Sequence, residues 1–165
     1  MNANGREQGR VNGDNVEAAV QQTHEVFADL LAYVTELRDS VPLLPTANGP
    51  RQTWPTEGRD WLLAVIHIIR EFVAEAPTKA ALECLGDLDA LMDECLGHAE
   101  SDLLVVGHSA ASDDCYTALA DGLVVILRRM VKEYPASIRR AAHPKDSTRG
   151  RFVLCRAGGS ESQDR

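Results

Sequence analysis

Two pairs of histidine and glutamate have the helical spacing that could hold a metal ion. His67 and Glu71 are four residues apart, as are Glu94 and His98, and helical bundles build metal sites from such residues projecting into the core. At about 100° per residue, both pairs fall outside the apolar stripes of their own segments, so their side chains should face solvent. We therefore predict no metal ligand and no cofactor.

A serine in a glycine-initiated turn is a second candidate for chemistry. The segment 107–111, Gly-His-Ser-Ala-Ala, follows Asp-Leu-Leu-Val-Val. It resembles the nucleophile elbow of α/β-hydrolases and the strand-to-loop segment of universal stress proteins. Both need a parallel sheet, whereas residues 14–106 show three helical periods instead. We interpret Ser109 as a loop residue and predict no catalytic residue.

Paired carboxylates could hold magnesium. Glu36 and Asp39 match one half of the carboxylate pattern of the all-α nucleotide pyrophosphohydrolases, in which two helices supply the ligands. The other half is missing, because Glu71 and Glu75 are four residues apart. The acidic residues at 87–94 are more simply a solvated face. A magnesium-dependent nucleotide hydrolase that uses acidic helix faces is an alternative to the function favoured below.

The charges are divided unevenly along the chain. Residues 1–127 carry 7 Lys/Arg and 21 Asp/Glu, whereas residues 128–156 carry 9 and 2. We predict that this basic segment binds a partner or docks on acidic helices of its own chain or of a second copy. Nucleic acid is a less favoured partner, because the acidic body would repel phosphates. The predicted partner-binding residues are Arg128, Arg129, Lys132, Arg139, Arg140, Arg149 and Arg151.

Four helices would position these side chains. The longest predicted helix covers residues 78–106, with an apolar stripe in steps of three and four. Helices are also predicted over residues 14–41, with Asp14 as N-cap, over 56–75, and over 112–134, with Ser112 as N-cap. The stripe of the longest helix comprises Leu82, Leu85, Leu88, Met92, Cys95, Ala99, Leu103 and Val106.

Prolines mark the predicted boundaries of these helices. Residues 42–55 contain four prolines and predict a long ordered loop rather than a tight turn, crossing the bundle through Leu43, Leu44 and Trp54. Such a connection could join two parallel helices. Pro135 is predicted to stop the fourth helix, and a short separate helix is predicted over residues 136–142.

The predicted fold is all-α: a four-helix bundle with a long Pro-rich first connection and a basic C-terminal extension. Residues 1–13 are predicted to be a disordered leader, residues 14–134 the bundle domain, and residues 135–165 the partly disordered extension. Four cysteines without CxxC spacing favour a reduced, cytoplasmic protein. No apolar run approaches the roughly 18 residues that a membrane span needs, so we predict no membrane association.

The favoured function is a non-catalytic helical interaction module, such as an adaptor, an inhibitor or a regulatory subunit, that acts through helix faces and the basic tail. Leu63 and Val105 lie off the main stripes of their helices, and surplus apolar surface of this kind often marks an interface. Homodimerisation would bury it. A nucleic-acid-associated regulator that acts through the basic segment is a further alternative.

Overall fold

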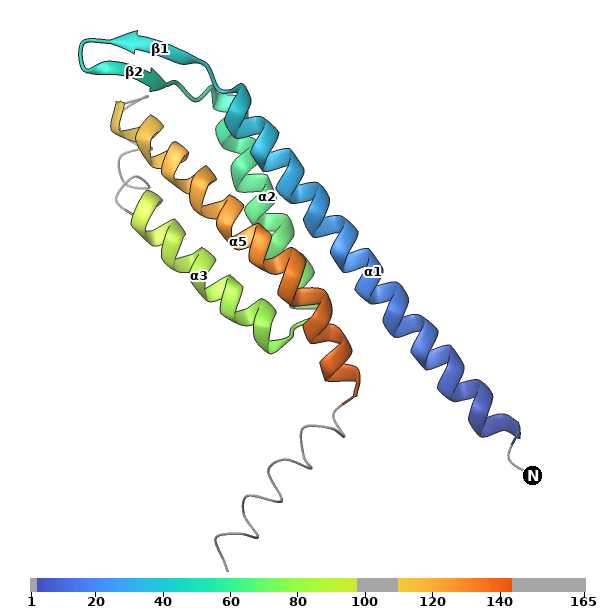
Figure 1. Ribbon diagram of the computed structural model, residues 1–165. Helices are drawn as coiled ribbons and strands as arrows, with labels where there is room; N and C mark the ends of the chain where they lie inside the picture. The colour runs from blue at the N-terminus through green and yellow to red at the C-terminus, as the bar shows by residue number, and fades with distance from the viewer. Residues whose placement is uncertain (1–2, 98–109, 144–165) are drawn as a thin grey trace, which may run out of the picture.

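The structure, a computed structural model, describes the backbone of residues 3–97 and 110–143 and the side chains of residues 13–97 and 113–143. Within these ranges the chain is mainly helical, which confirms the all-α class (Figure 1). Its helices are α1 (Ala3–Ser40), α2 (Thr56–Glu75), α3 (Lys79–Leu96) and α5 (Ala110–Ala142), and its strands are β1 (Leu43–Thr46) and β2 (Gly49–Gln52).

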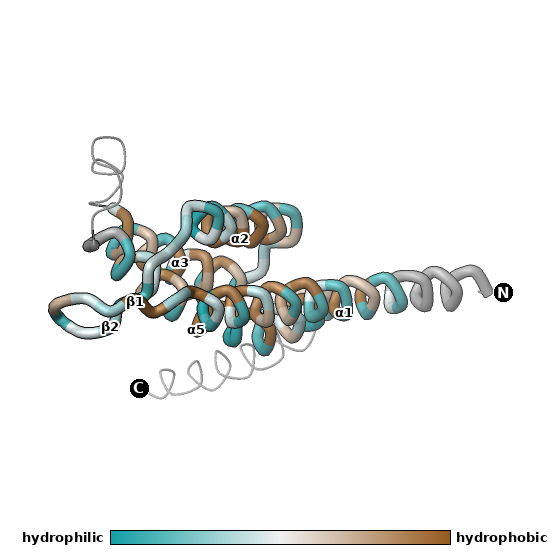
Figure 2. Tube along the Cα trace, turned by 90° about the horizontal axis from the view of Figure 1, so that it is seen from above, coloured by the Kyte–Doolittle hydropathy of each residue, from teal (hydrophilic) through white to brown (hydrophobic). Residues whose placement is uncertain are grey.

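Successive helices run in opposite directions, so the chain goes up, down, up and down (Figure 1). Helix α5 packs against α1 on one side and α3 on the other. Seen from above, α1 and α5 lie together, and α2 lies on the opposite side of the core (Figure 2). No helix within the described ranges is both long and apolar enough to cross a membrane.

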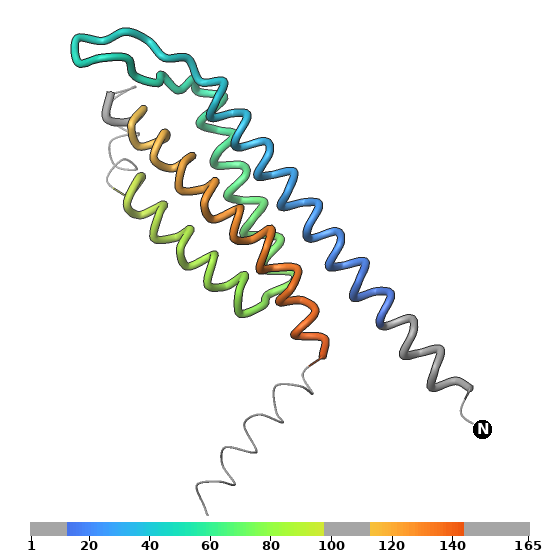
Figure 3. The backbone as a smooth tube through the Cα atoms, in the orientation of Figure 1, coloured from blue at the N-terminus to red at the C-terminus, as the bar shows by residue number. Residues whose placement is uncertain are grey.

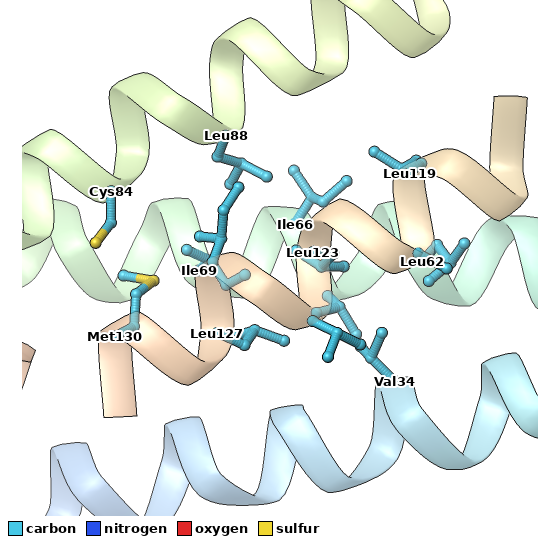
Figure 4. Packing of buried hydrophobic residues seen from close by; sticks show 14 of the residues in the cluster. Val34, Leu62, Ile66, Ile69, Cys84, Leu88, Leu119, Leu123, Leu127 and Met130 are labelled. Carbon is cyan, nitrogen blue, oxygen red and sulfur yellow. The ribbon is translucent and has the colours of Figure 1, made fainter. Parts of the chain in front are cut away.

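The core lies where apolar side chains from all four helices converge (Figure 4). Helix α5 supplies Leu119, Leu123 and Leu127, each fully buried. At one end of the bundle, the Phe27 ring of α1 lies edge-on to both Phe72 of α2 and Tyr134 of α5, at centroid distances of 5.3 Å. Such edge-to-face aromatic pairs add to the burial energy.

Helix α2 has the predicted bounds, but α1 does not. Helix α1 begins at Ala3, so Asp14 lies inside it and is not the predicted N-cap, and residues 3–13 are helical in place of the predicted leader. A capping pattern allows a helix to begin at Asp14 but does not require it to. Residues 1–41 contain no proline that would stop the helix from extending towards the N-terminus. Glu17, three residues after Asp14, accepts a hydrogen bond from Arg139.

Helix α3 begins as expected, with the Thr78 hydroxyl accepting a hydrogen bond from the Ala81 amide at 3.2 Å. It ends at Leu96, with Gly97 as C-cap. The rest of the predicted helix, up to Val106, lies outside the described residues. Of the predicted stripe, Leu88 and Cys95 are buried. At the start of α3, however, Leu82 is 53% exposed, and Ala81 and Cys84 are buried in its place.

Small residues allow α3 and α5 to lie close together. A Cβ atom at Gly122 of α5 would lie only 2.6 Å from the Leu91 methyl carbons. Gly122 therefore lets α3 approach α5 closely, and the narrow Ala81 and Cys84 side chains fit this approach better than Leu82 does.

Helix α5 continues through Pro135, so the predicted stop is wrong. The predicted short helix over 136–142 is its last part, and Ser112 lies inside it rather than at its start. Proline removes one main-chain hydrogen bond, but tertiary contacts hold the flanking turns. The Tyr134 hydroxyl donates to the Ala76 carbonyl at 2.6 Å, and the Ser137 hydroxyl lies 2.7 Å from that of Thr78.

Residues 42–55 form a hairpin, not the predicted long loop. Strands β1 and β2 are antiparallel, and a two-residue turn follows Thr46, with Gly49 at φ 103°. Pro45 faces Pro50 across the hairpin. Proline has no N–H to donate, so this pairing suits a non-hydrogen-bonded pair, in which the main-chain N–H groups would point away from the partner strand. Leu43 and Leu44 are exposed, so of the three predicted apolar anchors only Trp54 is buried. The hairpin joins antiparallel helices, not parallel ones (Figure 1).

Candidate protein-binding surface

Arg129, one of the predicted partner-binding residues, holds α5 to α3. Its guanidinium lies 2.6 Å from the Asp87 carboxylate and 3.5 Å from that of Glu83, both on α3. Its Nε atom lies 3.0 Å from Glu133, one turn further along α5. The hydrogen bond to Glu133 raises the pKa of Arg129 above its ordinary value. This side chain is therefore engaged within its own chain.

Arg139 makes a similar link between α5 and α1. Its Nε and Nη2 atoms lie 2.9 and 3.0 Å from the two Glu17 carboxylate oxygens. This fork-to-fork geometry is the favoured arrangement of arginine with a carboxylate. The hydrogen bond from Arg139 lowers the pKa of Glu17. Both pairs place predicted basic residues on acidic helices of the same chain.

The remaining predicted basic residues divide into two groups. Arg128, Lys132 and Arg140 are exposed, and among the described side chains none of them has an acidic partner in a salt bridge. Arg140 lines an open pocket of about 710 Å³ between the start of α3 and the end of α5, together with Lys79, Glu83 and Glu133. Arg149 and Arg151 lie outside the described residues, as does Ser109.

An exposed apolar strip runs along the seam between α1 and α2. Tyr33, Trp61 and Ile68 are 39%, 47% and 42% exposed. The rings of Tyr33 and Trp61 lie 6.2 Å apart between centroids, and Phe72 lies against α1 at the other end of the strip. Ile68 lies between Trp61 and Phe72 in the same row of α2. We call Tyr33, Trp61 and Ile68, with half-buried Val26, Leu30 and Phe72, the α1/α2 strip.

Helix α2 carries two adjacent apolar rows, and only one of them is buried along its whole length. Leu62, Ile66, Ile69 and Val73 are buried, whereas Trp61 and Ile68 in the other row are not. The residue that sequence reasoning singled out on α2, Leu63, is 37% exposed but lies on the side of α2 that faces α3. Val105 lies outside the described residues.

Carboxylates surround the α1/α2 strip. Asp29 and Glu36 lie three or four residues from Tyr33, and Glu57, Glu71 and Glu75 lie at helical spacing from Trp61 or Ile68, so they lie beside the strip. We call these five exposed residues the acidic rim. Within the described ranges none of the five pairs with Lys or Arg, and Glu71 has His67 as a neighbour at 3.0 Å.

A polar cluster that sequence reasoning missed fastens the hairpin to α5. Arg59 is 5% exposed, and its Nη2 atom lies 2.6 Å from Asp113. The Trp54 main chain donates to the same carboxylate at 3.0 Å, and its indole nitrogen donates to Thr117 at 2.9 Å. The Arg59 guanidinium also lies over the Tyr116 ring. The sequence signal that could have revealed this cluster is the Trp54-Pro55 pair just before α2, followed by Arg59 in the first turn of that helix.

Several of the described groups that could catalyse a reaction are paired or buried. Asp89, on the acidic face considered for magnesium, pairs with Arg70 at 2.8 Å, and Asp87 pairs with Arg129. Burial raises the pKa of the Cys84 and Cys95 thiols, which lowers the thiolate fraction. The part of the chain that the structure describes contains no group of three His, Cys, Asp or Glu side chains placed to hold a metal ion.

Comparisons with protein-family models, with curated proteins and with solved structures found no match to this chain.

Proposed function

We propose that this chain is a non-catalytic interaction module whose α1/α2 strip binds a protein segment that carries both basic and apolar side chains. The observation that carries the proposal is an exposed row of Tyr33, Trp61 and Ile68 beside carboxylates without basic partners among the described residues. Helix faces were the predicted binding surfaces. The α1/α2 strip is such a face, and its apolar residues and neighbouring carboxylates suit a ligand that is both apolar and basic.

The apolar residues of the strip support affinity. Tryptophan and tyrosine are the residues most enriched where a few side chains dominate binding energy. Trp61 and Tyr33 contact each other, so each limits the freedom of the other before a partner arrives. A partner that covers both rings and Ile68 would remove a continuous apolar surface from water.

The acidic rim supports selectivity. Carboxylates around an apolar surface attract cationic partners and repel acidic ones, with a larger effect on the association rate than on the final affinity. The rim belongs to the strongly acidic part of the chain, residues 1–127, which carries 21 Asp/Glu and 7 Lys/Arg. We expect a basic amphipathic helix to be the favoured ligand, laid along the seam with its apolar face inward.

A helical peptide made of leucine and lysine tests the proposal, with a leucine–glutamate peptide of the same length as its control. Both lack aromatic residues, so Trp61 fluorescence reports binding above the constant signal of buried Trp54. We expect a saturable blue shift with the lysine peptide only, weakened by salt because the charges are exposed.

Two variants locate the binding site. Ile68→Ser removes an apolar residue of the strip and should weaken peptide binding by about tenfold, as for loss of a central contact. Leu63→Ser alters an apolar residue of similar exposure on the other side of α2 and should leave binding unchanged. Equal binding of both peptides, or equal affinity of the two variants, would contradict the proposal.

A further inference from the structure

We infer that the chain's own C-terminal segment, residues 149–156, occupies the α1/α2 strip and competes with external partners. This inference rests on the proposed function, because it needs the strip to be a docking surface. It goes further by naming one occupant, which is supplied by the same molecule.

The chemistry of the segment matches the strip. Its sequence, Arg-Gly-Arg-Phe-Val-Leu-Cys-Arg, places three arginines around Phe152, Val153 and Leu154. The three apolar side chains would pack on Trp61 and Ile68, and the arginines would pair with the acidic rim. The arginines of the helical body are largely committed elsewhere: Arg38, Arg70, Arg129 and Arg139 each contact a carboxylate away from the rim.

The chain is long enough to reach the strip. The Tyr134 ring of α5 lies against Phe72 of α2, with 6.0 Å between centroids. At about 1.5 Å per residue, Ala142 lies about 12 Å beyond this level and Ile68 about 6 Å before it. The nine residues 143–151 span up to about 30 Å when extended. This length covers the axial distance of about 18 Å and the width of one helix, about 10–12 Å.

The end of α5 lies on the correct side of the bundle. The Arg139–Glu17 pair holds the last turns of α5 against α1, and α1 carries one side of the strip. The segment therefore has to pass only α1. Because the contact is intramolecular, a tether of a few residues gives an effective concentration in the millimolar range, so even a weak contact is substantially populated.

The test compares three full-length proteins. The first is unaltered, the second carries Arg149→Glu and Arg151→Glu, and the third carries Arg128→Glu and Lys132→Glu, the same charge change on an exposed face of α5. If the segment covers the strip at least half of the time, the lysine peptide should bind the second protein at least about twofold more tightly than the first. The third protein should bind it as the first does.

Acrylamide quenching of Trp61 fluorescence provides a second readout without peptide. We expect quenching to increase in the second protein and in the unaltered protein at high salt, and not in the third. Equal quenching and equal affinity in all three proteins would overturn the inference while leaving strip-dependent peptide binding, and hence the proposed function, intact. Loss of Ile68-dependent binding as well would overturn both. If Trp61 were protected from acrylamide only at high protein concentration, and the protein then had twice the mass of one chain, the segment of a second copy would occupy the strip. That result would overturn the intramolecular arrangement.

Discussion

Arg59 is a charged side chain held inside the protein, at the point where the hairpin, α2 and α5 meet. Its guanidinium contacts Asp113 at 2.6 Å and stacks over Tyr116. A buried charge requires such partners, because its transfer from water is costly. The same Asp113 oxygen also accepts the Trp54 amide. One carboxylate thus satisfies two groups from segments more than 50 residues away in sequence.

We predict that Asp113→Ala lowers the free energy of unfolding by about 3 kcal/mol, at the lower end of the range for breaking a buried ion pair. The lower end applies because Asp113 retains some exposure, 18% of its side chain. Urea unfolding followed by circular dichroism measures this change.

The neighbouring residue provides the control. Asp114 pairs with Arg51 at 3.6 Å, and both side chains are exposed. Asp114→Ala should cost less than about 1 kcal/mol. Similar losses for the two variants would show that the Arg59–Asp113 pair does not fasten the hairpin.

At the scale of the element, α3 shows how two apolar rows compete for one interface. Leu82 and Leu85 belong to one row, Ala81 and Cys84 to the other, and Leu88 to both. The structure buries the second row against α5 and leaves Leu82 exposed and Leu85 half-buried. Periodicity identifies the helix, but the distance to its neighbour decides which row faces inward.

We predict that Leu88→Ala costs about 2–5 kcal/mol, because it leaves a cavity in the core. Leu82→Ala should change stability by less than about 0.5 kcal/mol, as expected for an exposed position. Thermal and urea unfolding of both variants measure the difference. If Leu82→Ala were the more damaging of the two, the observed exposure of Leu82 and burial of Leu88 would be wrong.

Local signals predicted some element boundaries and missed others for a physical reason. Helix α2 begins at Thr56 and ends two residues before Pro77, as predicted, because a proline within a helix removes a main-chain hydrogen bond. At Pro135 the Tyr134–Ala76 and Ser137–Thr78 hydrogen bonds outweigh the local cost, and these partners are more than 50 residues distant in sequence. The exposure of Trp61 and Ile68 could not be predicted, because it depends on how α1 and α2 are placed.

At the scale of the molecule, Tyr134 is the residue where three helices meet. Its ring contacts Phe27 of α1 and Phe72 of α2, and its hydroxyl donates to the carbonyl of Ala76, which follows α2. Burial raises the pKa of Tyr134 to about 12. Ionisation of this phenol therefore opposes the packing of α1, α2 and α5 together.

We predict that the protein loses stability as pH rises from about 10 to 12. In this window the unfolded chain releases the phenolic proton, whereas the folded protein retains it, so the free energy of unfolding falls by at most about 1.4 kcal/mol per pH unit from this residue. Below the ordinary tyrosine pKa both states keep the proton, and the stabilisation is fully present.

A Tyr134→Phe variant separates this effect from the other groups whose pKa is raised, Tyr116, Cys84 and Cys95. It lacks one hydrogen bond and should be about 1 kcal/mol less stable at neutral pH. Its deficit should shrink above pH 10, as measured by urea unfolding at each pH. A deficit that stays constant up to pH 12 would exclude Tyr134 as the titrating residue.

The up-and-down course of the chain brings the start of α1 and the end of α5 to the same end of the bundle (Figure 3), where Glu17 and Arg139 are paired. A mechanical load applied across these two ends would unzip α1 from α5 turn by turn, beginning at that pair. A load applied between the hairpin and the end of α5 would instead have to shear whole helix interfaces at once. The protein should therefore yield easily to tension in one direction and resist it in another.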